Sequence, residues 1–301
     1  MDSDQILRRT MHFTLILTLM LLSVINEEPV NAVDFKVVDL THVQDLSTIY
    51  WPGNPKYNFT VLSRNRSANG YWYESNSFQT AEHGGTHLDA PAHFAEGKNR
   101  QHQIPMEKLV GPGVVINVKT KVSKNPDYRV ITDDLKDWET RNGMIPSGAV
   151  VIMNSGWTSK YPNKTLTFGS QTPDDSSTFH FPGWHEDAID WLIKNRQIHV
   201  VGVDTPSTDY ARSTTYPVHV LLGLADIPGV ENVANLDLIP ESGSIIYVAA
   251  IKLYDGSGGP TRVFSTFVEN GMTGSSSPLC SSIINFILTI VFGLVIYSAF
   301  R

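Results

Sequence analysis

Residues 83–93 read His-Gly-Gly-Thr-His-Leu-Asp-Ala-Pro-Ala-His, with three imidazoles and one carboxylate at odd-numbered positions. The two glycines and the proline argue against a helix in this stretch. In an extended chain, alternate side chains point to the same side. We therefore expect one wall of the segment to carry His83, His87, Asp89 and His93. Gly85, between the first two histidines, is expected to leave room for an ion or a substrate.

These side chains predict a site for a divalent transition metal. Imidazoles combined with a carboxylate suit Zn²⁺, Mn²⁺ or Fe²⁺ better than Ca²⁺ or Mg²⁺. The predicted ligands are His83, His87 and Asp89. His93 is the predicted general acid–base, because an imidazole titrates near neutral pH. A fourth ligand is the alternative role for His93, and a histidine-rich surface loop is the alternative for the whole stretch.

The stretch resembles the pattern H-x-G-T-H-x-D-x-P-x-H of the cyclase family of metal-dependent hydrolases, which includes bacterial kynurenine formamidases and isatin hydrolases. Every fixed position matches. Further similarity over roughly residues 36–268 involves Tyr50-Trp51-Pro52-Gly53, Gly202–Ser207, and His219 with Glu231. The resemblance implies a single α/β domain with a mixed sheet, the swivelling β/β/α fold. It also implies a homodimer.

The resemblance implies roles for residues outside the first motif. Asp89 would bridge to a second metal held with His219, and Glu231 would bind both metals. Both one-metal and two-metal sites occur in the family. A turn at residues 227–229 is needed to bring the two side chains together. The alternatives are that His219 is a packed histidine and that Glu231 is a solvated carboxylate. Trp51 is predicted to stack on a planar substrate, and Ser207 to hydrogen-bond that substrate. The alternatives are a tryptophan of the hydrophobic core and a serine of a turn.

The predicted activity is hydrolysis of a small aromatic amide by metal-activated water, of the arylformamidase type, with N-formylkynurenine as an example. Cleavage of a cyclic amide such as isatin is the alternative, and so is a non-catalytic surface protein that retains the fold. Asn154-Ser155-Gly156 lacks the first glycine of a nucleophile elbow, which excludes an α/β-hydrolase serine. The net charge of −7 gives no indication of nucleic-acid binding.

The N-terminal sequence predicts export. Arg8 and Arg9 precede the apolar run Phe13–Ile25, so residues 1–32 are a predicted signal peptide, with an uncleaved anchor as the alternative. Residues 33–270 are the predicted hydrolase domain. Sequons begin, in polar and loop-like stretches, at Asn58, Asn65 and Asn163.

Residues 271–301 are a predicted attachment segment. Small residues at 271–277 precede the apolar run Ile283–Phe300, a pattern typical of a GPI signal. A transmembrane anchor is the alternative. The protein is therefore expected outside the cell, anchored at its surface. The only cysteine, Cys280, lies in this segment, so the domain must be stable without disulfides.

Short apolar runs rich in β-branched residues predict strands at 35–40, 114–118, 149–153, 199–203, 245–252 and 263–267. Helices are predicted at 133–141, with Thr132 as N-cap, and at 185–196. A shorter helix is predicted to hold His219 and Leu222.

Overall fold

The computed structural model describes residue 5 and residues 35–268. Apart from residue 5, the predicted signal peptide and attachment segment lie outside the described residues. Among the residues described, no helix is both long and apolar enough to cross a bilayer.

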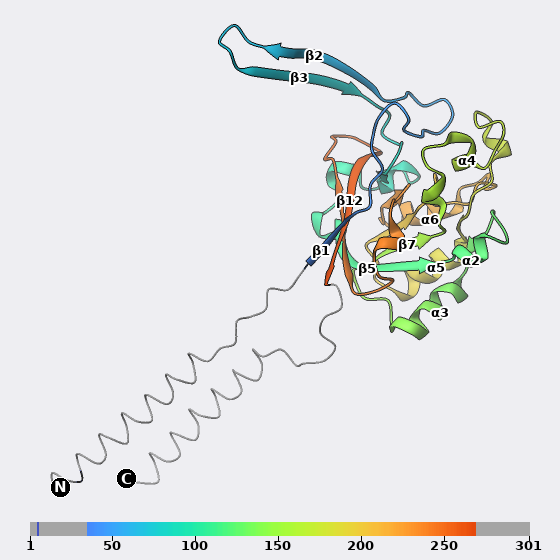
Figure 1. Ribbon diagram of the computed structural model, residues 1–301. Helices are drawn as coiled ribbons and strands as arrows, with labels where there is room; N and C mark the ends of the chain where they lie inside the picture. Colours follow the sequence, from blue (N-terminus) through green and yellow to red (C-terminus); the bar gives the residue numbers. More distant parts are fainter. Residues whose placement is uncertain (1–4, 6–34, 269–301) are drawn as a thin grey trace. The chain divides into compact units, whose positions relative to one another are not determined.

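A mixed sheet forms the centre of the domain. Its strands are β1 (Phe35–Asp39), β4 (His87–Asp89), β5 (Val110–Asn117), β7 (Val150–Asn154), β9 (Val200–Val203), β10 (Gly229–Glu231), β11 (Ser244–Ala250) and β12 (Gly258–Val268). Because β4 pairs with both β10 and β12, seven strands close into a ring in the order β12-β11-β5-β7-β9-β10-β4. β1 is added along the outside of β12 (Figure 1). The run β5-β7-β9-β10 is parallel, and the remaining pairs are antiparallel.

Alternation along the strands produces two hydrophobic cores. On β7, Val150 and Ile152 join a core to which every strand of the ring contributes. Val151 and Met153 face the other way, into a core shared with the helices. Both sets are completely buried. A strand covered on both faces explains why β7 reads as an unbroken apolar run.

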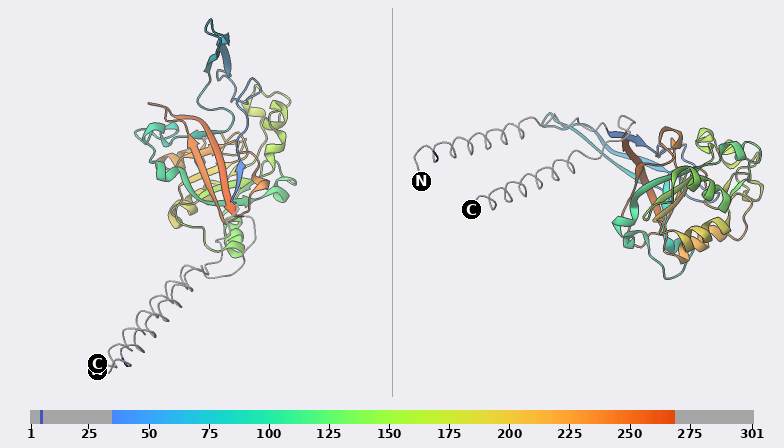
Figure 2. Two further views of the ribbon diagram at one scale, coloured as in Figure 1. Left: turned by 60° about the vertical axis from the view of Figure 1, so that its left-hand side comes forward. Right: turned by 90° about the horizontal axis from the view of Figure 1, so that it is seen from below.

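The helices are α2 (Lys119–Val122), α3 (Thr132–Asn142), α4 (Lys164–Phe168), α5 (Glu186–Asn195) and α6 (Pro217–Leu224). Short 3₁₀ turns are η1 (Pro91–His93), η2 (Gln101–Gln103), η3 (Met106–Leu109), η4 (Trp157–Lys160), η5 (Ser176–Thr178) and η6 (Leu236–Leu238). α3, α5 and α6 pack their apolar faces on the outer side of the ring (Figures 1 and 2). A two-stranded sheet, β6 (Arg129–Val130) with β8 (Gly183–Trp184), lies beside them.

The six predicted strands and the three predicted helices are confirmed, with shifted ends. The N-cap prediction for α3 was wrong, because Thr132 is the first helical residue and Ile131 is the cap. The Asp134 carboxylate accepts the Ile131 N–H at 2.9 Å, which replaces the expected threonine cap. In α5 the cap is His185, whose Nδ1 accepts the Asp187 N–H.

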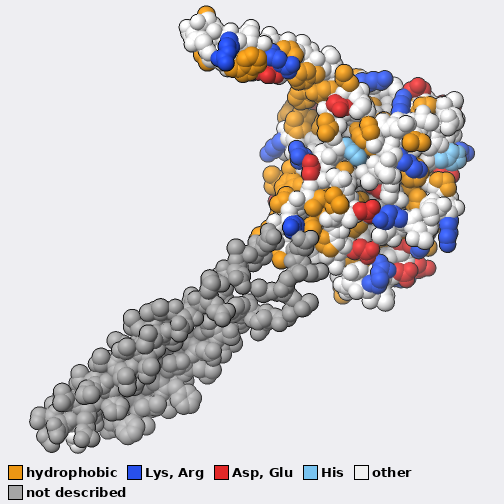
Figure 3. Space-filling model, viewed as in Figure 1, with side chains coloured by type: hydrophobic (Ala, Val, Ile, Leu, Met, Phe, Trp, Pro, Cys, Tyr) orange, Lys and Arg blue, Asp and Glu red, His pale blue; other side chains and the backbone are white. Residues whose placement is uncertain are grey.

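A two-stranded ribbon, β2 (Asn58–Arg66) with β3 (Trp72–Gln79), extends from the body (Figures 1 and 2). Its side chains are largely exposed, including those of Phe78 and Trp72. Hydrophobic side chains are visible on the surface of the ribbon (Figure 3). The prediction that the sequons lie in loops was wrong for the first two, although Asn163 does lie in the loop that precedes α4. Asn58 and Asn65 are strand residues of β2, and Asn163 caps α4 by accepting the Leu166 N–H. All three asparagines are exposed.

Candidate metal centre

The site is built on β4, the short strand that closes the ring. Leu88 points into the ring core and is fully buried, so His87 and Asp89 point to the opposite face. Glu231 on β10 lies directly across from His87 in the antiparallel register. The closure of the ring thus brings together two segments that are far apart in the sequence.

The expected extended wall over residues 83–93 was wrong in its geometry. Only His87–Asp89 is a strand, and Pro91–His93 is a 3₁₀ turn. Gly85 has a φ of +59°, the left-handed conformation that favours glycine. The resulting turn, instead of strand alternation, directs His83 back toward Asp89.

The first group of possible ligands is His83, His87 and Asp89. His83 Nδ1 lies 2.6 Å from Asp89 Oδ1, and His87 Nε2 lies 3.3 Å from the same oxygen. One ligand atom from each residue lies within 4.8 Å of the others. The three predicted ligands therefore converge on one point.

A second group shares Asp89 with the first and adds His219 and Glu231. His219 Nε2 lies 3.4 Å from Asp89 Oδ2 and 3.2 Å from Glu231 Oε1. Glu231 Oε2 lies 3.5 Å from His87 Nε2, which joins the two groups. The residues implied by the resemblance are thus brought together, while their roles as ligands stay predictions.

Hydrogen bonds fix two of the imidazoles. His87 Nδ1 lies 2.9 Å from the Gly85 carbonyl, and His219 Nδ1 lies 2.6 Å from Asp209 Oδ2. Each of these oxygens accepts the Nδ1 proton, so Nε2 is left free to bind an ion. The expectation that Gly85 leaves room for an ion was wrong, because a Cβ there would meet Thr48 at 3.0 Å. Its carbonyl orients His87.

Sequence reasoning missed Asp209 and Thr208. Asp209 also accepts the backbone N–H groups of Val218 and His219, both at 3.1 Å, and so holds the first turn of α6. The Thr208 N–H donates to Glu231 Oε1 at 2.8 Å. The available signal was the polar run that follows β9, because polar residues gather at the carboxyl ends of parallel strands.

In the described part of the chain, neither Ser207 nor Trp51 forms a hydrogen bond, ion pair or ring contact with the predicted ligands. Ser207 is buried, and its carbonyl accepts the Thr205 hydroxyl. Trp51 packs edge-on against three phenylalanines, at centroid distances of 5.3–6.5 Å: Phe168, Phe179 and Phe181. This is the packing expected of the core alternative, and the substrate-binding roles of both residues stay predictions.

Burial and charge oppose each other in the site. Burial disfavours the charged form of His87, but Asp89 and Glu231 outweigh it and raise its pKa to about 9. Burial and the neighbouring Asp89 carboxylate raise the pKa of Glu231. For His219, burial is likewise outweighed by Asp209, Asp89 and Glu231, so its pKa is raised well above the usual value. The site thus gathers negative charge that a cation would neutralise.

His93 stands at the mouth of the site in η1. Its ring stacks on that of His83 at a centroid distance of 3.9 Å and an interplanar angle of 19°. Crowding by its neighbours removes hydration and lowers the pKa of His93 to about 4, although part of the residue is exposed. His93 is therefore neutral at pH 7 and able to accept a proton.

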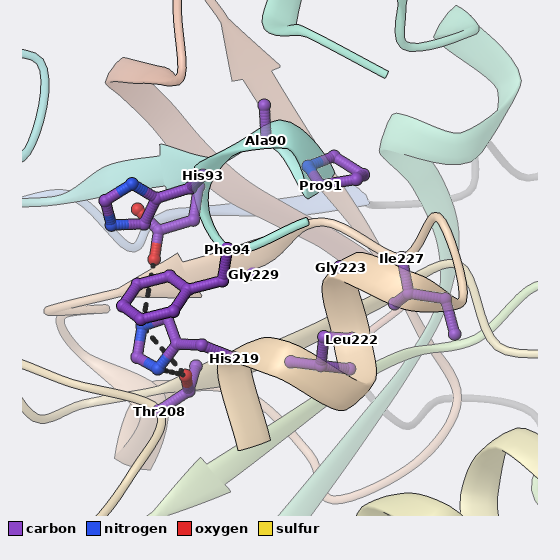
Figure 4. Close-up of a pocket in the computed structure, with 11 residues that line it drawn as sticks. Ala90, Pro91, His93, Phe94, Thr208, His219, Leu222, Gly223, Ile227 and Gly229 are labelled. Atoms are coloured by element: carbon purple, nitrogen blue, oxygen red, sulfur yellow. Dashed lines mark hydrogen bonds and ion pairs between the residues drawn. The ribbon is translucent and has the colours of Figure 1, made fainter. Parts of the chain in front are cut away.

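Two hollows adjoin His93. The inner one, about 10 Å³, has room for roughly one water and is lined by His93, Phe94, Thr208 and His219 (Figure 4). The outer one is an open cleft of about 660 Å³ that shares His93 and Phe94 with the inner hollow. Its rim includes Tyr254. The volume is in the range of sites for small organic molecules.

The donor set fits a divalent transition metal. Asp89 and Glu231 are buried carboxylates beside imidazoles whose Nε2 atoms face them. Within residues 35–268, the ion-pair partners of these two carboxylates are histidines, with no lysine or arginine among them. Buried anions surrounded by nitrogen donors are typical of such centres. The fold and this site define a metal-dependent hydrolase.

Comparison with known proteins agrees with this class. A family model described as "Putative cyclase" matches residues 38–210. An isatin hydrolase of Roseibium aggregatum is 27% identical over 233 residues, which cover 75% of this chain and 86% of that protein. A kynurenine formamidase of Salinibacter ruber is 22% identical over 227 residues, covering 75% and 95%.

Among solved structures, isatin hydrolase A from Ralstonia solanacearum is similar with a TM-score of 0.71 and 33% identity, covering 77% of this chain and 92% of that one. The chain belongs to the cyclase family. The expected α/β fold with a mixed sheet is confirmed.

Proposed function

We propose that the protein hydrolyses the amide bond of a small aromatic compound in the cleft beside His93. The observation that carries this proposal is the convergence of five possible ligands, in two groups sharing Asp89, next to a neutral histidine. The open cleft of about 660 Å³ offers room for one aromatic ring system. The full ligand set argues against a non-catalytic surface protein.

A bound divalent ion would supply Lewis-acid chemistry, polarising a carbonyl and acidifying water. His93, neutral at pH 7, takes a proton from the water that attacks the amide carbon, and returns it to the amide nitrogen as the C–N bond breaks. His83 fixes the plane of the His93 ring by stacking. Asp209 and the Gly85 carbonyl hold His219 and His87 in the orientation that exposes Nε2.

Two substrate types fit this chemistry. Ring opening of a cyclic anilide such as isatin is favoured by the relatives, since the isatin hydrolases reported above are 27% and 33% identical to this chain. The arylformamidase reaction expected from the sequence is the second candidate, supported by the kynurenine formamidase at 22%.

The test is a parallel assay of isatin and N-formylkynurenine with the full-length chain, supplied with Zn²⁺ or Mn²⁺. We expect turnover of at least one substrate, with isatin preferred. Asp89→Ala is the control and should be inactive on both. Equally slow hydrolysis by the wild type and by Asp89→Ala would contradict the proposal.

We also propose that the enzyme is exported, carries glycans, forms a homodimer and is held at the cell surface by a GPI anchor. The sequence patterns at residues 1–32 and 271–301 and the three exposed sequons support export, glycans and the anchor. The family resemblance supports the homodimer. Phosphatidylinositol-specific phospholipase C should release the protein from intact cells. Retention, together with detection of an epitope placed after Arg301, would favour a membrane span. Light scattering of the released protein gives its oligomeric state.

A further inference from the structure

The third imidazole of the site, His83, is held differently from the other two. His87 and His219 turn Nδ1 toward an oxygen and leave Nε2 at the centre of the site. His83 instead turns Nδ1 toward the centre, 2.6 Å from Asp89 Oδ1. Its Nε2 points outward and lies 3.0 Å from the hydroxyl oxygen of Ser257.

The direction of the hydrogen bonds at Ser257 follows from its second partner. Ser257 Oγ lies 2.7 Å from Glu82 Oε2, and a carboxylate can only accept. The serine proton is therefore donated to Glu82, and the serine oxygen is left to accept. It accepts the Nε2–H of His83, so Glu82, Ser257 and His83 form one chain of donors and acceptors.

The backbone holds Ser257 in this place. Its carbonyl accepts the Ala90 N–H at 2.8 Å, directly beside β4. Glu82 Oε2 also accepts the N–H groups of Ser257 and Gly258, at 2.9 and 3.2 Å. Gly258 lies so close to His83 that a Cβ there would be 2.4 Å from the imidazole. The contact between segments 82–83 and 257–258 is therefore tight.

We infer that Ser257 and Glu82 are positioning residues that keep the proton of His83 on Nε2, so that His83 binds the metal through Nδ1. This inference rests on the metal site proposed above. It also links Ser257 to the acid–base, because the His83 ring that it orients stacks on His93. Removal of the hydroxyl takes away the acceptor of the Nε2 proton and so weakens metal binding.

The first test measures Zn²⁺ affinity of the full-length chain by competition with a chromogenic chelator, without substrate. Ser257→Ala should bind Zn²⁺ about 10-fold more weakly, the low end for loss of such a partner because Ser257 is partly exposed. Ser257→Thr, which keeps a hydroxyl, should restore binding to within about threefold. Ser265→Ala is the matched control, since Ser265 lies on β12, is fully buried, and its hydroxyl has no hydrogen-bond partner among residues 35–268.

Unchanged affinity in Ser257→Ala would overturn the inference, and so would equal losses in Ser257→Ala and Ser265→Ala.

The second test uses the wild-type protein loaded with Zn²⁺. Long-range ¹H–¹⁵N correlation spectra assign the protonated nitrogen of each histidine, with His83 identified from the His83→Gln variant. We expect a proton on Nε2 of His83 and on Nδ1 of His87 and His219. A proton on Nδ1 of His83 would overturn the inference, whereas failure of the wild type to bind Zn²⁺ would overturn the metal site itself.

Discussion

The metal centre buries charged side chains, whereas the β2–β3 ribbon exposes apolar ones. At the centre, Asp89 and Glu231 are buried, and each is surrounded by nitrogen donors. On the ribbon, Phe59 and Phe78 face each other across the strands and are exposed. Buried ionisable groups are costly unless they are paired, so their concentration at one place indicates function. The ribbon, by contrast, is a surface feature that contributes no group to the described site.

The largest effect is expected at Asp89, which belongs to both groups of ligands. Asp89→Ala should lose metal binding by more than about 100-fold and reduce turnover to background, since ligands act together around an ion. Metal content after dialysis and an amidase assay measure both. Retention of stoichiometric metal would contradict the shared-ligand arrangement.

His93→Ala should keep its metal and lose turnover by roughly 10²–10⁴-fold, as expected for removal of a general acid–base. The measurement pairs steady-state kinetics with metal analysis. His180→Ala is the control, because His180 bonds Asp127 outside the site. If metal and activity fall in proportion, His93 is a ligand and its assigned role is wrong.

Asp209→Asn should weaken metal binding about 10- to 100-fold, because an amide cannot hold the Nδ1 proton of His219 as a carboxylate does. Chelator competition gives the affinity. Asp127→Asn is the matched control, since it alters a second aspartate–histidine contact, of 2.7 Å, with His180. Equal effects of the two substitutions would show that Asp209 has no special role toward the metal.

Asp204→Asn should change the pH dependence of stability. Burial raises the pKa of Asp204 to about 6, above its unfolded value, so the folded state binds the proton more tightly. The free energy of unfolding should therefore fall as pH rises from about 4 to 6, by about 2–3 kcal/mol from this group. Urea unfolding at several pH values should show a flatter profile in the variant. An unchanged profile would mean that Asp204 does not titrate in this range.

The smallest effect is expected on the ribbon. Phe78→Ser should change the free energy of unfolding by less than about 0.5 kcal/mol and leave turnover unchanged, because the side chain is exposed. Phe179 is completely buried in the core between the sheet and the helices. Phe179→Ser should therefore lower the free energy of unfolding by roughly 3–5 kcal/mol. Loss of turnover in Phe78→Ser would show that the ribbon takes part in catalysis.

The sequence predicted the long strands and the first motif because their signals are local. β7 and β9 are apolar runs between turn residues, and the motif places its donors within eleven positions. β4 and β10 were missed because each has only three residues, and their pairing joins segments more than a hundred residues apart. That pairing closes the ring and places Glu231 across from His87.

The orienting groups were also beyond sequence reasoning. Asp209 acts through the geometry of α6, and Ser257 reaches His83 only because β12 pairs with β4. The sequence around an aspartate or a serine in a polar segment does not indicate which histidine it will contact in the fold. The left-handed turn at Gly85 explains how His83 joins the site without strand alternation.

The most direct test of the account is turnover of the preferred aryl amide by the full-length chain after exhaustive chelation, followed by stepwise addition of Zn²⁺ or Mn²⁺. We predict that chelation abolishes hydrolysis and that added metal restores it. Recovery should saturate at one or two ions per chain and should be absent in Asp89→Ala. Full activity in the demonstrably metal-free protein would contradict this prediction.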